Sequence, residues 1–336
     1  MAQDRVVVQS VGLVLGGDVG GTSTRILVAS HDGMSLRRGT AGGGNPTAHP
    51  ETAADALDRS LCEALEGLDP AMVRAAVIGL AGGTALHHPR VSAAFGRVWA
   101  ANGLTCAPAY VPDLEVAFAA GTAEPDGTVL IAGTGASAGA LRDRRLIQTA
   151  DGHGWLLGDD GSGFWLGREA ARATLCSLDA GGPLGPLATS VLGALAIAEH
   201  PPAGEPPGPS HRRARVISTL NERPPIRLAE LAPLVTSAFE NDDAVAGDIV
   251  ERAAGLLSRT LGRIREAGEV TPIVLAGSLA GERSPVGARL RAMVSERFAG
   301  DVFSAADGVG GAAWLALASL DPAAANNEVR ARLVQH

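Results

Sequence analysis

The chain has 336 residues, of which 46% are apolar and 19% charged, a composition typical of folded globular proteins. Its net charge of −8 shows no basic excess and argues against a nucleic-acid partner. All 28 basic side chains are arginines, which excludes a Schiff-base lysine, a P-loop lysine and a protein-kinase lysine. Because a single hydrophobic core rarely organises more than about 250–300 residues, we expect two domains.

Targeting signals and cysteine spacing point to a cytoplasmic protein. The first residues lack the basic and apolar regions of a signal peptide, and no apolar run reaches the roughly 18 residues of a membrane helix. Cys62, Cys106 and Cys176 are widely spaced and odd in number. They fit neither a disulfide framework nor a metal site, so we predict buried thiols and no membrane partner.

Two hairpin patterns divide the chain. The apolar, β-branched runs 11–17 and 22–30 flank a short Gly-rich turn, which predicts a β-hairpin. The run 127–141 repeats strand, Gly/Thr/Ser turn and strand about 115 residues later. This recurrence predicts two domains of related fold.

Between the hairpins, helical and strand patterns alternate, which predicts a largely parallel sheet covered by helices. The expected elements are a helix at 50–66, a strand at 73–80, a helix at 90–101, a strand at 106–111 and a helix at 114–121.

After the second hairpin the pattern predicts a loop, several helices and a final βα alternation. These elements are a loop at 151–163, helices at 164–177, 228–239 and 243–267, a strand at 272–276, a helix at 286–298, a strand at 301–304 and a helix at 310–319, before a frayed or coiled tail. Within the Pro/Gly-rich stretch 181–210, the run 200–210 predicts a surface loop or a small insertion around 180–225.

The turn at residues 18–25, DVGGTSTR, has the chemistry of a phosphate-binding turn. Two glycines let backbone N–H groups approach an anion, three hydroxyls can donate to phosphate oxygens, and an arginine adds a fixed charge. In order, these residues are Gly20, Gly21, Thr22, Ser23, Thr24 and Arg25. Asp18 ends the strand, where its carboxylate can hold Mg²⁺ directly or through water. Taken alone, an ordinary Asp-x-Gly-Gly hairpin turn explains this segment equally well.

Three further segments have weaker signals of the same kind. Gly133, Thr134 and Gly135 form the turn of the second hairpin. A strand runs into Gly277 and Ser278, where small residues allow a flat ring to lie against the backbone. The helix start at 307–317 is rich in small residues, which we attribute to close helix packing with an Asp307 N-cap.

The order of these four segments resembles the superfamily of sugar kinases, heat-shock chaperones and actin, from about residue 13 to 318. The resemblance implies an α/β fold with two ribonuclease-H-like (actin-like ATPase) domains, an interdomain nucleotide and sugar cleft, and ATP with Mg²⁺ as cofactors. Residues 1–122 would hold the first phosphate hairpin, the sugar loop and the general base. Residues 123–336 would hold the second phosphate hairpin and the adenosine motif.

The run 151–170, DGHGWLLGDDGSGFWLGREA, resembles the signature of the N-acetylglucosamine/glucosamine kinase branch of the BadF/BadG-type ATPase family. That resemblance implies Asp113 as the general base, because the family carries its catalytic aspartate at a matching strand-to-helix junction. An N-cap role for Asp113 is equally compatible with its position. The implied sugar contacts are Asn45, Thr134, Asp151, Gly152, His153, Gly154 and Asp159.

Acidic residues near the implied sugar site favour a free amine on the substrate. A 2-ammonium group seeks a carboxylate, and Asp151, Asp159, Asp160 and Glu115 are all available nearby. Asp160 stands where the family more often has Glu, and His153 stands where some relatives have Trp. We therefore predict phosphorylation of the 6-hydroxyl of glucosamine, with N-acetylglucosamine as the alternative substrate.

Two functions of other classes compete with a kinase. An ATP-driven reductase activator would need paired cysteines for an iron–sulfur cluster, and the three cysteines suggest no such pair. A non-catalytic sugar sensor would need a DNA-binding segment, and about ten residues precede the first predicted strand. The expected partners are thus ATP and a small amino sugar, with a homodimer implied by the resemblance alone.

Overall fold

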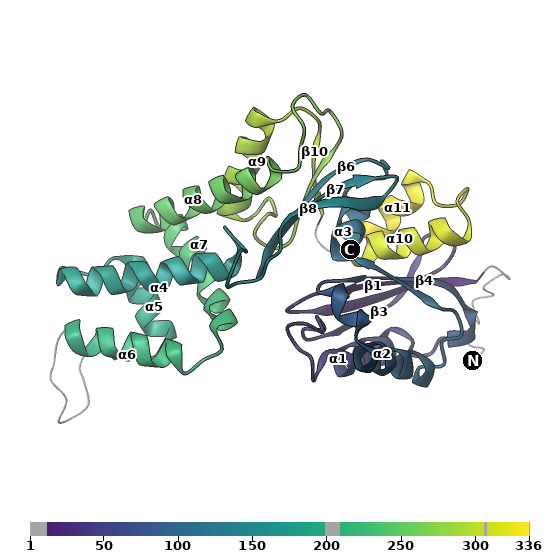
Figure 1. Cartoon of the computed structure of the whole chain (residues 1–336), viewed down its shortest axis with the longest axis horizontal. Helices are drawn as coiled ribbons and strands as arrows, with labels where there is room; N and C mark the ends of the chain where they lie inside the picture. Colours follow the sequence, from purple (N-terminus) through teal and green to yellow (C-terminus); the bar gives the residue numbers. More distant parts are fainter. Residues whose placement is uncertain (1–11, 199–208, 306–307, 336) are drawn as a thin grey trace, which may run out of the picture. The chain divides into compact units, whose positions relative to one another are not determined.

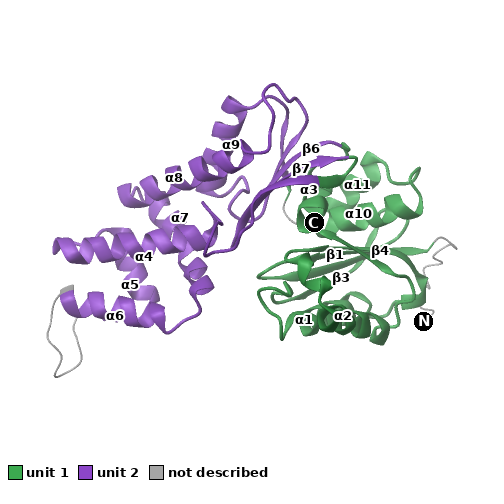
Figure 2. Ribbon diagram, in the orientation of Figure 1, with its two compact units in different colours: residues 1–125, 143–146, 305–336 green, residues 126–142, 147–304 purple. Residues whose placement is uncertain are grey.

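The computed structural model describes residues 12–198, 209–305 and 308–335, which form two compact units. Unit 1 contains the described residues of 1–125, 143–146 and 305–336, and unit 2 those of 126–142 and 147–304 (Figure 2). This division differs from the expected boundary at 122/123, because the C-terminal residues belong to unit 1 rather than to the second domain. The reason is packing, since the C-terminal helices cover the sheet of unit 1.

Unit 1 is built on a mixed sheet with the strand order β3-β2-β1-β4-β5. Its strands are β1 (Leu13–Val19), β2 (Thr24–Ala29), β3 (Ser35–Ala41), β4 (Val73–Leu80) and β5 (Pro108–Pro112). The predicted first hairpin is confirmed as the antiparallel pair β1–β2, whereas β1, β4 and β5 run parallel. Strand β3 was not predicted, because its sequence SLRRGTA is polar and mostly half-buried or exposed.

Helices cover both faces of this sheet (Figure 1). Helices α1 (Ala53–Ala64) and α2 (Pro89–Ala101) bury Leu57, Leu61 and Phe95 against one face. Helices α3 (Asp113–Gly121) and α10 (Val309–Leu320) share a core with the other face. Helix α11 (Asn327–Val334) packs on α10, and two 3₁₀ turns, η1 (Pro70–Met72) and η2 (Gly83–His87), complete the unit.

Gly16 shows how closely α10 packs on β1. A Cβ at this position would lie 2.3 Å from the backbone nitrogen of Ala313 and 2.5 Å from the carbonyl oxygen of Val309. Gly16→Ala is therefore expected to lower the free energy of unfolding by about 1–3 kcal/mol, measured by urea denaturation. Gly96→Ala on the exposed side of α2 is the matched control, because its Cβ would contact nothing and alanine favours a helix. Equal stability of the two variants would contradict the close packing.

Unit 2 contains a second five-stranded sheet with the order β10-β9-β6-β7-β8. Its strands are β6 (Gly127–Ala132), β7 (Ala136–Arg142), β8 (Arg145–Asp151), β9 (Ile273–Ala276) and β10 (Val302–Ala305). The second predicted hairpin is confirmed as the antiparallel pair β6–β7, and β9 runs parallel to β6. Strand β8 was missed because it is an edge strand with mostly exposed residues, so it lacks the apolar run of a buried strand.

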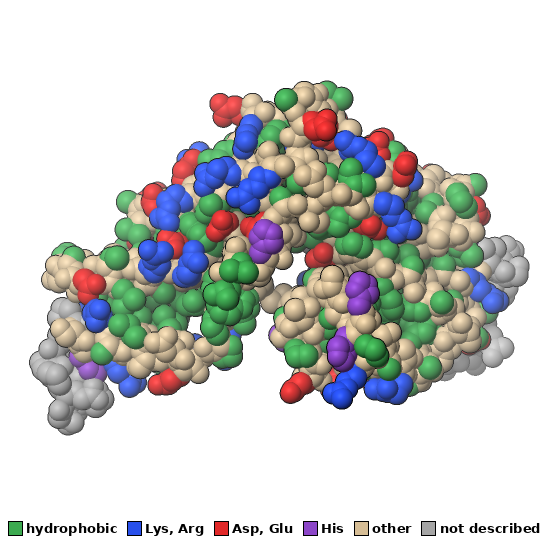
Figure 3. Space-filling view, viewed as in Figure 1, with side chains coloured by type: hydrophobic (Ala, Val, Ile, Leu, Met, Phe, Trp, Pro, Cys, Tyr) green, Lys and Arg blue, Asp and Glu red, His purple; other side chains and the backbone are tan. Residues whose placement is uncertain are grey.

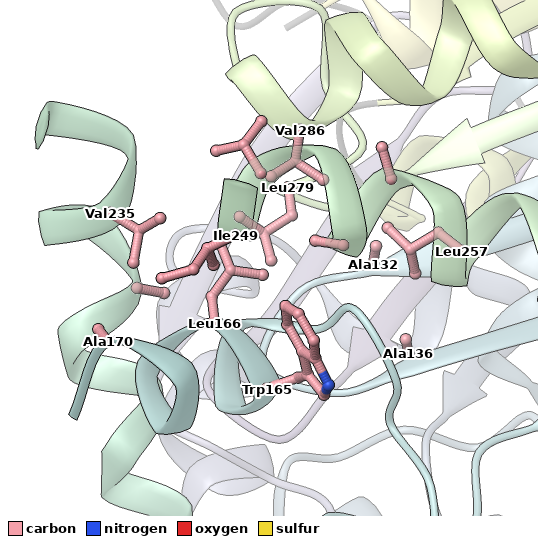
Figure 4. Packing of buried hydrophobic residues seen from close by; sticks show 14 of the residues in the cluster. Ala132, Ala136, Trp165, Leu166, Ala170, Val235, Ile249, Leu257, Leu279 and Val286 are labelled. Carbon is pink, nitrogen blue, oxygen red and sulfur yellow. The ribbon is translucent and has the colours of Figure 1, made fainter. Parts of the chain in front are cut away.

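The helices of unit 2 are α4 (Gly163–Ala180), α5 (Pro186–Ala194), α6 (Pro209–Asn221), α7 (Ala232–Glu240), α8 (Ala244–Leu261) and α9 (Pro285–Arg297), with a 3₁₀ turn η3 (Pro225–Leu231). Figure 4 shows their common core, in which Trp165 and Leu166 of α4 lie near Ile249 of α8. The described parts of 180–225, predicted as a loop or small insertion, contain α5 and α6. Their Pro and Gly content concealed this, although proline is well tolerated in a first turn, as at Pro186. Residues 199–208 of the Pro-rich run, and Asp307, lie outside the described residues.

The prediction of three buried thiols is wrong. Cys62 and Cys176 are exposed, and Cys106 is partly buried, which raises the pKa of its thiol. Within the described ranges, no helix is long and apolar enough to cross a bilayer. On the face shown in Figure 3, arginine and acidic side chains lie beside one another.

Candidate functional site

The first Gly-rich turn is closed by its own backbone. The Gly20 N–H donates to the Ser23 carbonyl oxygen at 2.9 Å, and the turn links β1 to β2. The Thr24 hydroxyl is buried and donates to the Gly42 carbonyl, so this group is engaged by the protein itself. Thr22 is exposed and Ser23 half-exposed, and their hydroxyls remain the accessible ones of the three.

The sugar loop predicted at Asn45 contacts this same turn. The N–H groups of Gly44 and Asn45 both donate to the Gly20 carbonyl oxygen, at 3.0 and 3.1 Å. The Asn45 side-chain oxygen accepts from the N–H groups of Thr47 and Ala48, so it holds the loop, while its amide NH₂ is available to a ligand. His49 adds a ring nitrogen 2.6 Å from the Gly21 carbonyl, a contact that the sequence did not indicate.

Asp18 and Asp113 lie at one edge of the sheet of unit 1. Asp18 is paired with Gly79 of β4, which in turn is paired with Val111 of β5. The carboxyl ends of parallel strands lie at the same end of a sheet, and Asp113 directly follows the last residue of β5. Two strand spacings, about 10 Å, separate β1 from β5. Topology thus brings together two carboxylates that are 95 residues apart in the chain.

The environment of each carboxylate is distinct. Burial, followed by the charge of Asp18, raises the pKa of Asp113 to about 6, against a smaller opposite effect of the Leu114 N–H, which donates to Asp113 Oδ1 at 3.0 Å. Asp18 Oδ2 accepts from the Gly308 N–H at 3.0 Å, and Arg25 Nη1 lies 4.0 Å away. A carboxyl with a pKa near neutrality suits a general base.

The Gly308 contact gives the fourth small-residue segment a place in the site. Gly308 is the N-cap residue of α10, so the positive end of the helix dipole lies at the Asp18 carboxylate. Sequence reasoning attributed this segment to helix packing alone. A Cβ on Gly308 would lie 2.7 Å from Val116 Cγ2 and 3.2 Å from Asp18 Cγ, so glycine fits closely at this position.

A second cluster of predicted residues lies at the strand ends of unit 2. The Gly133 N–H donates to Gly135 O at 2.9 Å, and the first N–H groups of α4, from Gly163 and Phe164, donate to the carbonyls of Gly133 and Thr134. Beside them, the Leu279 N–H donates to Ala132 O, which fixes the turn of Gly277 and Ser278 against the end of β6. The hairpin turn and the predicted adenosine turn are therefore neighbours.

Gly277 has a specific structural requirement at this point. Its φ is +91°, and a Cβ would lie 2.4 Å from the Ala132 carbonyl oxygen. Glycine is the residue that adopts such a conformation without steric cost. Ser278 next to it is exposed and can therefore contact a ligand.

The predicted sugar carboxylates Asp151 and Asp159 are both buried, with 7% of each residue exposed. Asp151 accepts from two backbone N–H groups, those of Asp159 at 2.8 Å and Asp160 at 3.1 Å. Asp159 Oδ1 accepts from the Ala136 N–H at 3.0 Å, and burial, with the nearby charges of Asp151 and Asp160, raises the pKa of its carboxyl. These carboxylates hold the loop 151–160 in shape.

The rest of this loop is exposed. Gly152 donates its N–H to Ala136 O, and His153 Nδ1 lies 3.9 Å from Asp151 Oδ1 with most of its side chain in solvent. Gly154 begins a turn that exposes Leu156 and Leu157 at 73% and 79%. The loop therefore presents backbone groups, an imidazole and apolar side chains rather than its buried carboxylates.

The donor set in unit 1 fits a magnesium ion that is shared with a nucleotide. Mg²⁺ in such sites takes one or two carboxylates, completed by phosphate oxygens and water. Asp18 supplies one carboxylate directly before the turn 20–23, as predicted for the metal ligand. Within the described ranges no three acidic, His or Cys side chains converge as a metal site.

Comparisons with solved structures show the fold. Candidate N-acetylglucosamine kinases from Chromobacterium violaceum and Porphyromonas gingivalis match with TM-scores of 0.70 and 0.69, at 24% and 22% identity, over 92% of this chain and 99% of theirs. A ROK family glucokinase from Streptomyces griseus, solved with glucose and AMPPNP, matches with a TM-score of 0.59 at 21% identity, over 91% of this chain and 99% of that one. The predicted α/β fold of two actin-like domains is therefore confirmed.

Sequence comparison gives a family and one curated relative. An N-acetylmuramic acid/N-acetylglucosamine kinase from Clostridium acetobutylicum is 32% identical over 90 residues, which cover 27% of this chain and 29% of that protein. The model of the BadF/BadG/BcrA/BcrD ATPase family matches residues 15–316, a range that includes every site residue described above. The chain belongs to the BadF/BadG/BcrA/BcrD ATPase family.

Proposed function

We propose that the protein is an ATP-dependent amino-sugar kinase that transfers the γ-phosphoryl group of ATP to the 6-hydroxyl of N-acetylglucosamine. The observation that carries this proposal is the position of Asp18 and Asp113 at the same end of the sheet, where the pKa of Asp113 is raised to about 6. Family membership supports the use of ATP, and the curated relative is itself a kinase of acetylated amino sugars.

The proposed mechanism assigns a separate task to each group. Asp113 accepts the proton of the sugar 6-hydroxyl as its oxygen bonds to the γ-phosphorus, while the bond from that phosphorus to the β,γ-bridging oxygen breaks and ADP leaves. The N–H groups of residues 21–23 and the hydroxyls of Thr22 and Ser23, with Arg25, would bind phosphate oxygens. The Asp18 carboxylate would hold Mg²⁺, directly or through water. When bound, Mg²⁺ neutralises charge on the phosphates. Ser278 and Gly277 would contact the adenosine, and Thr134 the phosphates or the sugar.

The structure alters the argument for the substrate. Glucosamine was favoured because four carboxylates were available for an ammonium group. Asp151 and Asp159 instead accept backbone N–H groups, and Glu115 accepts the N–H of Leu146. The exposed Leu156 lies in the same loop as the predicted sugar contacts and suits an acyl substituent. These observations favour N-acetylglucosamine.

Glucosamine remains the second candidate substrate because of Asp160. Its carboxylate accepts no hydrogen bond from the described residues, and the residue is half-buried. Such a group could pair with a 2-ammonium.

A comparison of kcat/KM for N-acetylglucosamine and glucosamine tests which sugar is the preferred substrate. The rate of ADP release is followed by coupling it to NADH oxidation. We expect N-acetylglucosamine to give the higher value, and Asp160→Asn to lower only the value for glucosamine. A higher kcat/KM for glucosamine would reverse the assignment.

Size-exclusion chromatography with light scattering tests the homodimer implied by the resemblance.

A further inference from the structure

Glu115 is a buried charge in an otherwise apolar helix. It lies two residues after Asp113 on α3, where every residue from Leu114 to Gly121 is buried, and Glu115 itself is 6% exposed. Burying a carboxylate without partners is costly, so a buried glutamate is expected to have hydrogen-bond or ion-pair partners. Its Oε1 accepts from the Leu146 N–H at 3.0 Å, and its Oε2 lies 3.5 Å from Arg145 Nη1. Both partners belong to the segment 143–146.

This segment is the turn of the β7–β8 hairpin, and it belongs to unit 1 although the rest of both strands belongs to unit 2. Asp143 and Arg144 adopt positive φ angles of 49° and 61°, as the two central residues of a type I′ hairpin turn do. Contacts with other residues of unit 1 also hold this turn.

Arg144 supplies most of those contacts. Its backbone N–H donates to the Pro125 carbonyl at 2.7 Å, and its Nη2 donates to the Ala123 carbonyl at 2.9 Å. Its guanidinium carbon lies 5.1 Å from the centroid of the Trp314 ring on α10. A cation over an aromatic ring adds a favourable electrostatic contact. The segment 143–146 is thus fixed in unit 1 by backbone, ring and carboxylate contacts together.

Strand β8 continues from this segment to the predicted sugar loop. It begins at Arg145 and ends at Asp151, whose carboxylate holds the N–H groups of Asp159 and Asp160. One seven-residue strand therefore connects the helix that begins with Asp113 to the loop 151–160.

We propose that Glu115 is a positioning residue, which fixes the first turn of the Asp113 helix to the start of β8, the strand that leads to the loop 151–160. This inference rests on the proposed function for its kinetic consequence. Glu115 itself touches no substrate in this account. Its Oε2 pairs with Arg145 and its Oε1 accepts the Leu146 N–H, so both of its oxygens contact the segment 143–146.

Two substitutions separate the hydrogen bond from the charge. Glu115→Ala removes both contacts and is expected to lower kcat by about 10- to 100-fold with the KM for ATP unchanged, because a small displacement of a base is costly. Glu115→Gln keeps an acceptor for Leu146 and should restore most of kcat. Asp243→Ala is the matched control, because it removes a buried carboxylate that caps α8 in unit 2. This control should lower the Tm and leave kcat unchanged.

Hydrogen exchange gives a readout that does not require activity. In Glu115→Ala, amide exchange should rise in 143–146 and in 151–160 but not in α9, whereas Asp243→Ala should leave both segments protected. If wild-type protein phosphorylates no amino sugar, the proposed function fails, and exchange alone decides this inference. A Glu115→Ala variant with a lower Tm, but with wild-type kcat or unchanged exchange in 151–160, would overturn it.

Discussion

Replacing Asp113 by asparagine is expected to lower kcat by about 10²–10⁴-fold, the usual contribution of a general base. Asparagine is nearly isosteric and its side-chain oxygen can still accept the Leu114 N–H, so the start of α3 should persist. Because the side chain touches the reacting hydroxyl rather than anchoring ATP, the affinities for both substrates should change little. Isothermal titration with ATP and sugar, beside steady-state kcat, measures the two effects separately.

The pH dependence of kcat is a second test of Asp113 as the general base. A base must be deprotonated to act, and burial with the Asp18 charge raises the pKa of Asp113 to about 6. Activity should therefore be present above pH 6 and fall as pH decreases through that value. Residual activity of Asp113→Asn should lack this limb, whereas Asp55→Asn on the exposed side of α1 should keep it. A variant at position 113 with wild-type kcat would remove this residue from the mechanism.

Asp18→Asn is expected to reduce kcat on the order of 100-fold and to raise the Mg²⁺ concentration needed for half-maximal rate. The amide oxygen can still accept from the Gly308 N–H, so the contact between β1 and α10 should survive. Removing the carboxylate charge takes away one of the two causes that raise the pKa of Asp113. The acidic limb of the pH profile should accordingly move below pH 6.

A magnesium titration at several pH values measures both consequences in one series. Thermal denaturation of Asp18→Asn provides the control for folding, with Gly16→Ala as a destabilised reference from the same strand. An unchanged acidic limb would show that the charge of Asp18 does not act on Asp113. An unchanged magnesium requirement would show that the Asp18 carboxylate does not hold the ion.

The sequence was sufficient for the elements with strong apolar patterns. Both Gly-rich hairpins, strand β4 and helix α2 lie within a few residues of their predicted positions. Strands β3 and β8 were not predicted, because exposed edge strands have no buried face to produce a pattern. Helix α10 was predicted, but its place in unit 1 was not, since local periodicity carries no information on which sheet a helix covers.

The sequence indicated which turns and junctions carry the candidate residues, but not how the atoms of those residues are used. The Gly-rich turns follow from residue pattern, whereas Asp113 was singled out by the family resemblance. The engagement of Asp151, Asp159 and Glu115 by backbone N–H groups depends on distant turns, so their charges seemed available when they were not. The contact of Gly308 with Asp18 joins residues 290 positions apart and left only a small-residue pattern as its signal.

The most direct test of the proposed activity follows the phosphoryl group itself. Purified protein, Mg²⁺ and ATP labelled with ¹⁸O in the γ-phosphoryl group would be incubated with N-acetylglucosamine, and the products identified by mass spectrometry and ³¹P NMR. The account predicts labelled N-acetylglucosamine 6-phosphate, formed in equal amount to ADP and strongly reduced in Asp113→Asn. ADP formed with only labelled inorganic phosphate, and no sugar phosphate from any amino sugar, would contradict it.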